Sequence, residues 1–140
     1  MEKKRILALD LGARRIGVAV SDPLGITAQG LGTIERRNGH SDMAELQKLV
    51  KDYEVGMIVV GQPLSMNGQA GTQAQNATAF ADQLRRRLST PVTMWDERLT
   101  TAEAQRVLKA SGVGLEKRKQ AIDRMAAVIL LQSFLDRSPE

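Results

Sequence analysis

The segment 55–60, Val-Gly-Met-Ile-Val-Val, is a nearly continuous apolar run rich in β-branched side chains. A strand with one face in water alternates apolar and polar residues, and this run does not alternate. It is typical of a strand buried on both faces, as found in a partly parallel sheet covered by helices. The run therefore favours an α/β fold.

The other periodic segments agree with this fold class. Strands are also predicted over 6–11, 16–21, 27–34 and 91–96, and the first two are joined by a tight turn at Gly12. Apolar spacing of three and four residues predicts helices over 41–53, 72–88, 100–110 and from Ile122 onward, with a basic, mobile segment over 115–120. This order predicts an α/β fold with a five-stranded mixed sheet, its first three strands antiparallel, and helices on both faces.

Length and composition narrow the class of protein. The 140 residues contain no Pro/Gly/Ser-rich linker, so we expect one domain over 1–140. With no membrane-length apolar stretch, no secretory signal and no cysteine, we expect a cytoplasmic protein that does not act at a membrane. A net charge of +4 favours a polyanionic partner, and only 3% aromatic residues favours contact with a nucleic-acid backbone over base stacking.

Asp10 is the first candidate functional residue. Ile6, Ala8 and Asp10 share one face of the strand 6–11, so an acid continues an apolar row. An ionised carboxylate in such surroundings requires a cation or hydrogen bonds. The structural alternative is that Asp10 accepts hydrogen bonds from amides of the Gly12 turn.

Further acids fall near the ends of two other elements. Asp96 and Glu97 close the strand 91–96 and point to opposite faces, so only one of them can face Asp10, and alternation does not choose between them. Asp123 lies in the opening turn of the last predicted helix, on a side of small residues that would let the helix pack closely. For each position the alternative is an acid placed favourably at a helix N-terminus.

Together these acids predict a metal site. Mg²⁺ and Mn²⁺ prefer hard oxygen ligands, and separate elements of this chain would supply them. The candidate ligands are Asp10, Asp123 and one or both of Asp96 and Glu97. Such ions activate water and stabilise the leaving oxygen of a phosphodiester, so no protein nucleophile is required. The single histidine, His40, stands beside a predicted helix start and is expected to cap it or face water.

Four ordered motifs span nearly the whole chain. They are Asp-Leu-Gly at 10–12 with Arg-Ile-Gly-Val-Ala at 15–19, Val-Gly-Gln-Pro at 60–63 with Met-Asn-Gly at 66–68, Asp-Glu-Arg-Leu-Thr at 96–100, and Ile-Asp at 122–123 with Ala-Ala-Val-Ile-Leu-Leu-Gln at 126–132. In these motifs the chain resembles the YqgF/RuvX family of ribosomal RNA processing nucleases and Holliday-junction-resolvase-like proteins. The resemblance implies a ribonuclease H-like fold and a catalytic metal site at Asp10, Glu97 and Asp123.

The same resemblance implies a role in maturing the 5′ end of the small-subunit ribosomal RNA precursor. The expected partners are therefore structured RNA and pre-ribosomal particles, with branched DNA as the alternative substrate. Gln132 stands where resolvases of the wider superfamily carry a further acid, so the number of metal ions, one or two, stays open.

Basic residues near the acids are candidates for substrate binding. Arg15 and Arg98 could hold a phosphate through a bidentate fork, or form ion pairs with the acids beside them. The cluster Lys117, Arg118 and Lys119 precedes Asp123, and substrate binding could order it. The glycine-rich loop 61–71 could also bring amides to a phosphate, although ordinary loop chemistry explains it equally.

Two other functions compete with a nuclease. The segment around Asp10 and Gly17 also resembles the phosphate-binding hairpin of actin-like ATPases and sugar kinases, but those enzymes close two domains over a nucleotide and this chain has the length of one. A non-catalytic RNA-binding or ribosome-assembly module is the second rival. The sequence does not choose between an RNA and a DNA junction as substrate, between an endonuclease and an exonuclease, or between a monomer and a homodimer. Junction resolution would require a dimer.

Overall fold

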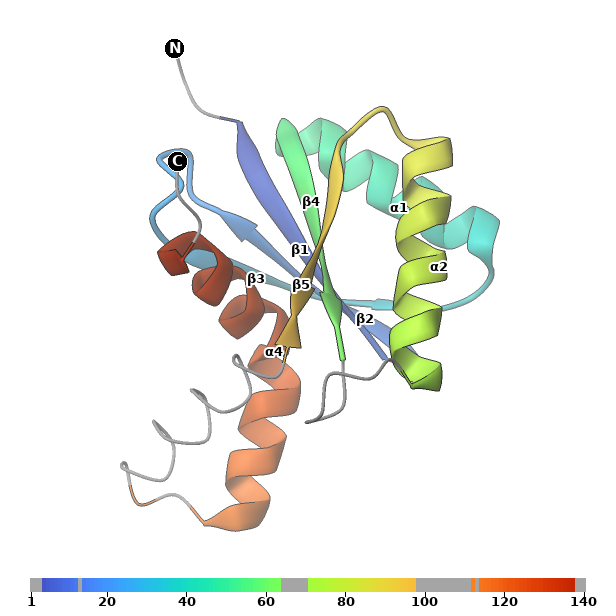
Figure 1. The fold of residues 1–140 in the computed structure, drawn as a ribbon. Helices are drawn as coiled ribbons and strands as arrows, with labels where there is room; N and C mark the ends of the chain where they lie inside the picture. Colours follow the sequence, from blue (N-terminus) through green and yellow to red (C-terminus); the bar gives the residue numbers. More distant parts are fainter. Residues whose placement is uncertain (1–3, 13, 64–70, 98–111, 113, 138–140) are drawn as a thin grey trace.

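The computed structural model describes residues 4–12, 14–63, 71–97, 112 and 114–137, with backbone alone for 115–124. Five strands form one mixed sheet in the order β3-β2-β1-β4-β5 (Figure 1). β1 pairs antiparallel with β2 and β2 with β3, whereas β4 runs parallel to both β1 and β5. The predicted mixed sheet is therefore confirmed. The strands are β1 (Arg5–Leu11), β2 (Arg15–Ser21), β3 (Ala28–Glu35), β4 (Val55–Gln62) and β5 (Val92–Asp96).

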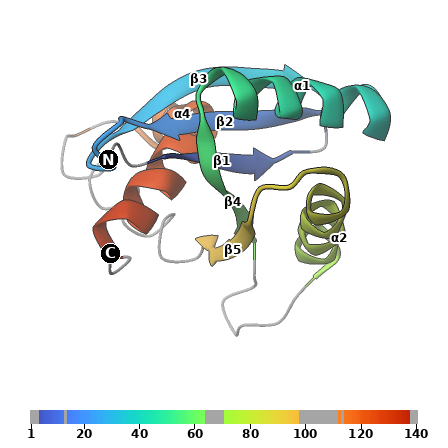
Figure 2. The ribbon, with the colours of Figure 1, turned by 90° about the horizontal axis from the view of Figure 1, so that it is seen from above.

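Helices cover both faces of this sheet, as predicted. α1 (Gly39–Asp52) and α2 (Thr72–Arg87) pack on one face, and α4 (Leu115–Arg137) packs on the other against β1, β2 and β3 (Figure 2). Asn38 caps α1, where its side chain accepts a hydrogen bond of 2.9 Å from the Ser41 amide. None of the helices described in the structure has the length and apolar character needed to cross a membrane.

Strand alternation divides the interior into two cores. Leu7 and Leu9 of β1 point to the α1 and α2 side, where they pack with residues such as Leu46 and Leu84. Ala8 of β1 points to the opposite side and packs with α4. The α4-side core consists of Ala8, Ala19, Val59, Ala127, Leu130, Leu131 and Phe134. Small residues on the strands let α4 lie close to the sheet.

The structure corrects two predicted boundaries. β4 continues to Gln62, so Gly61 belongs to a strand and not to the glycine-rich loop. α4 begins at Leu115, so the segment 115–120 is helical where the sequence predicted a mobile connection. The physical reason is that 115–120 contains no proline or glycine and consists of good helix formers. The helix predicted over 100–110 and the loop residues 64–70 lie outside the described residues.

Candidate active site

Asp10 lies near the end of the central strand β1, on the face that α4 covers. Ala8, two residues earlier, belongs to the α4-side core, and strand alternation puts Asp10 on the same face. The Gly12 amide donates to the Arg15 carbonyl oxygen at 2.8 Å. This amide is therefore engaged in closing the hairpin, and the alternative in which it satisfies Asp10 is not supported.

Glu97, and not Asp96, faces Asp10. Trp95 packs in the α4-side core, so Asp96, the last residue of β5, points to the other face. Glu97 follows the end of the strand, and its contacts with Asp10 and Gly61 place it on the α4 side. Burial raises the pKa of Glu97 from 4.5 to about 9, with further contributions from its hydrogen bond to the Asp10 carboxyl and from the charges of Asp10 and Asp96. The carboxyl group of Asp10 on β1 and that of Glu97, directly after β5, thus meet in a half-buried place although β1 and β5 are not neighbours in the sheet.

Gly61 of β4 lies beneath the Glu97 side chain. A Cβ atom built on Gly61 would lie 2.7 Å from Cδ and 2.9 Å from Cγ of Glu97. The Glu97 side chain therefore lies across β4, the strand that separates β1 from β5.

Helix α4 approaches the same row of the sheet. Gly17 is paired with Asp10 across β1 and β2, and a Cβ on Gly17 would lie 3.5 Å from Cβ of Ala127 in α4. Asp123 is four residues before Ala127, one helical turn away, and its side chain lies outside the described residues. The prediction that Asp123 lies in the opening turn is wrong, because α4 begins more than two turns earlier at Leu115. A helix-dipole role is thereby weakened, because that effect is confined to the first turn.

The donor set of the described residues fits a divalent cation in part. Asp10 and Glu97 would offer two hard carboxylate oxygens to such an ion, and two carboxyl groups in contact require either a proton or a cation. Within the described side chains, no group of three acidic, histidine or cysteine residues gathers to hold a metal. A third ligand would have to come from a residue such as Asp123, outside that set. His40 is exposed near the start of α1.

The predicted substrate-binding residues are only partly described. Nε of Arg15 lies 3.1 Å from Oε1 of Glu35 in an exposed ion pair, so its acidic partner is on β3 and not in the carboxyl pair. Arg98 lies outside the described residues. Lys117, Arg118 and Lys119 belong to the first turns of α4, with side chains that are not described.

Gln132 joins α4 to the turn between β2 and β3. Its side-chain oxygen accepts from the Ala28 amide, and its side-chain nitrogen donates to the Ile26 carbonyl and to Oδ1 of Asp136, each at 3.0 Å. Gln132, which stands where resolvases of the wider superfamily carry a further acid, therefore connects α4 to this turn.

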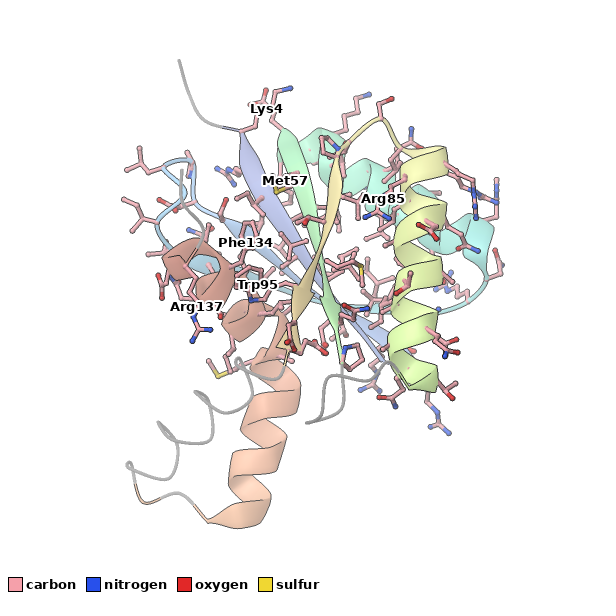
Figure 3. The ribbon with its side chains drawn as sticks, in the orientation of Figure 1. Lys4, Met57, Arg85, Trp95, Phe134 and Arg137 are labelled. Carbon is pink, nitrogen blue, oxygen red and sulfur yellow. The ribbon has the colours of Figure 1, made fainter. Side chains whose placement is uncertain are left out.

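The sequence-based interpretation missed Gly61 as a neighbour of the acids. The available signal was its position two residues after Val59 in an apolar strand, where a small residue leaves space on the face that also carries Asp10. Trp95 was likewise not singled out. Its ring packs edge-on against Phe134 of α4 with centroids 5.2 Å apart, immediately before the acids (Figure 3).

Comparison with known proteins gives consistent results. The family model described as "RuvX: Holliday junction resolvase" matches residues 4–137. The chain is 51% identical over 133 residues to a protein of Koribacter versatilis named "Putative pre-16S rRNA nuclease", covering 95% of this chain and 87% of that protein. It is 48% identical to a protein of the same name from Thermoanaerobacter pseudethanolicus, covering 94% of this chain and 96% of that one.

A similar fold occurs in solved structures. RuvC of T. thermophilus in complex with a Holliday junction substrate has a TM-score of 0.55 at 12% sequence identity, with 96% of each chain covered. At this identity the likeness concerns the fold, and it confirms the expected ribonuclease H-like architecture. With a family model that spans nearly all of the chain and relatives at about half identity, the chain belongs to the YqgF/RuvX family.

Proposed function

We propose that this protein is a divalent-metal-dependent nuclease that hydrolyses phosphodiester bonds in the 5′-end maturation of pre-16S ribosomal RNA. The observation that carries the proposal is the contact between Asp10 and Glu97 on the α4 face of the sheet. Burying two acids against each other is costly to the fold, and such an arrangement is common where the pair serves catalysis or metal binding. The names of the relatives supply the reaction class and the RNA substrate.

In this proposal Asp10 and Glu97 hold Mg²⁺ or Mn²⁺ together with Asp123 of α4. A divalent cation in such a site activates water and neutralises charge on the phosphate undergoing hydrolysis. β1 and the end of β5 hold the two carboxyl groups beside each other, and Asp123, one helical turn before Ala127 in α4, would add the third ligand. Asp96 adds negative charge next to Glu97.

Basic side chains would orient the nucleic acid. Arg15 is exposed at the hairpin that follows Asp10, and its exposed ion pair with Glu35 is weak enough to be exchanged for a phosphate. Arg98 and the cluster Lys117, Arg118 and Lys119 are proposed to contact phosphates on the same side. Contacts with the phosphate backbone of the nucleic acid give affinity for the substrate without a preference for its sequence.

A cleavage assay with and without Mn²⁺ tests the proposal. The substrates are a precursor RNA containing the 5′ end of 16S ribosomal RNA, a single-stranded RNA and a four-way DNA junction. Asp10→Asn should lower the rate by several orders of magnitude with the fold intact. Asp52→Asn, a matched change of an exposed acid in α1, should leave the rate unchanged.

The substrate profile separates the candidate functions. Preferred cleavage of the precursor RNA supports the proposal, and preferred cleavage of the junction supports resolution of Holliday junctions, the activity in the family model's description. Equal rates for wild type and Asp10→Asn, or RNA binding without cleavage at any Mn²⁺ concentration, would contradict a nuclease and favour an assembly factor.

A further inference from the structure

We propose that Gly61 is the positioning residue of the acidic pair: the side chain that it lacks leaves the path by which Glu97 crosses β4 to reach Asp10. The structural part of this inference stands on the contacts of the described residues. Its catalytic consequence rests on the proposed function.

The need for such a path follows from the order of the strands. Asp10 is on β1 and Glu97 follows β5, and β4 lies between these strands. Neighbouring strands are separated by about 4.8 Å, so side chains on one face of β1 and β5 begin roughly 10 Å apart. A hydrogen bond between carboxyl groups requires oxygens about 2.7 Å apart. Glu97 must therefore lie over the intervening strand.

The position that it crosses is occupied by glycine. β1 pairs with β4 in a register that ends at Leu9 and Val60, so Gly61 follows directly beside Asp10. A Cβ on Gly61 would overlap the Glu97 Oε1 and come within 3 Å of Cδ and Cγ, at 2.7 and 2.9 Å. The space of the missing methyl group is thus filled by the Glu97 carboxyl.

Backbone conformation does not explain this glycine. The described glycines with positive φ are Gly25, Gly32 and Gly112, and Gly61 has ordinary strand geometry. Alanine could therefore adopt the same backbone, and it would lower the entropy of the unfolded chain. The obstacle to alanine is the Glu97 side chain, which can swing away, so the substitution should displace the carboxyl group and leave the strand in place.

Gly17 provides a matched control on the opposite side of Asp10. A Cβ on Gly17 would lie 3.5 Å from Cβ of Ala127 and 3.6 Å from Cβ of Asp10, which are ordinary van der Waals distances. Both glycines flank the same acid on the same face of the sheet. Only the one beneath Glu97 has no room for a methyl group.

The test compares Gly61→Ala with Gly17→Ala in cleavage rate and in Mn²⁺ affinity measured by calorimetry. We expect Gly61→Ala to lower kcat about 100-fold with little change in KM, because a displacement of about 1 Å in a catalytic group has an effect of this size. Its Mn²⁺ affinity should fall as well. Gly17→Ala should remain within a few fold of wild type in both measurements. Equal kcat and Mn²⁺ affinity for Gly61→Ala and wild type would overturn the inference.

A double-mutant cycle on stability tests the positioning without any metal or substrate. Gly61→Ala should change the urea midpoint of the metal-free protein by a different amount in wild type and in the Glu97→Ala background, where only the small stabilisation from the lower entropy of the unfolded chain remains. If its effect is the same in both backgrounds, Glu97 does not occupy the path and the inference fails. Absence of cleavage by the wild type would instead contradict the proposed function, and the cycle would still decide the role of Gly61.

Discussion

A carboxyl group buried against another carboxyl group must keep its proton or gain a cation. Glu97 is in this situation: burial and the neighbouring Asp10 raise its pKa from 4.5 to about 9. The unfolded chain releases the same proton near the ordinary value. Between these two pH values the folded protein therefore binds more protons than the unfolded chain, and its stability without metal decreases as the pH rises.

Replacing Glu97 with glutamine should remove this pH dependence. In EDTA, Glu97→Gln should gain stability relative to wild type between pH 5 and pH 8, by at least about 1.4 kcal/mol, the equivalent of one pKa unit. Urea unfolding at the two pH values measures the difference. Glu45→Gln in α1 is the matched control, because Glu45 is exposed. Parallel pH profiles for wild type and Glu97→Gln would show that Glu97 ionises normally in the folded protein.

The sequence identified the acids individually and left one choice open. Asp10 stands out because it interrupts an apolar row, which is visible in the alternation of β1. The choice between Asp96 and Glu97 depends on which face of β5 meets α4. That face is set by the packing of Trp95 on Phe134, a contact between residues far apart in the chain that periodicity does not reveal.

At the scale of elements, α4 is fixed to the sheet near its C-terminal end. Gln132 binds the backbone of the β2–β3 turn, and Asp22 closes the same turn by accepting from the amides of Ile26 and Thr27 at 2.7 and 2.8 Å. These backbone hydrogen bonds lower the pKa of Asp22, with the Thr27 amide making the largest contribution. The turn is therefore an anchor for the helix that carries Asp123.

Loss of this anchor should reduce stability and leave the chemistry unchanged. Gln132→Leu leaves the Ala28 amide and the Ile26 carbonyl without their partner, which should cost about 1 to 2 kcal/mol because both groups remain partly accessible to water. Gln47→Leu, at an exposed position of α1, is the control. Chemical denaturation gives the stability. A fall in kcat measured on fully folded Gln132→Leu would instead indicate that Gln132 acts in the site.

Element boundaries were harder to predict than the elements themselves. The sequence predicted the strands and helices that have strong periodicity, but the predicted β4 and α4 are shorter than the observed elements. In β4 the error came from reading Gly61 as the start of a loop, although a glycine in a strand also marks a close approach of another group. In α4 the positive charges of 115–120 suggested a solvated connection, whereas their helix propensity is high.

At the scale of the whole molecule, the described residues form two cores separated by one sheet, and the α4-side core borders the acids. Leu46 of α1 and Leu130 of α4 are both fully buried, in the α1-side and α4-side cores respectively. Strand alternation in β1 makes this separation predictable from the sequence, because Leu7 and Leu9 alternate with Ala8 and Asp10. The distance between α4 and the sheet was not predictable, because it depends on which small residues of the strands pack against the helix, such as Ala8 and Ala19.

Truncations in the two cores should therefore differ in their effect on activity. Leu46→Ala and Leu130→Ala should each destabilise the protein by about 2 to 5 kcal/mol. Under conditions in which both variants are fully folded, Leu130→Ala should also lower the cleavage rate about tenfold, because the helix beside the acids is less firmly held. Rates normalised to folded protein provide the comparison. A similar loss for Leu46→Ala would indicate that general loosening, and not the position of α4, limits the rate.

The single tryptophan of the chain provides a natural optical reporter. Trp95 packs against Phe134 of α4 and stands two residues before Glu97, so its indole is at the junction between the helix and the acids. Its fluorescence emission should shift to longer wavelength when the helix detaches and water reaches the ring. Helix docking can thus be followed in real time on the unlabelled protein, separately from unfolding on the α1 side.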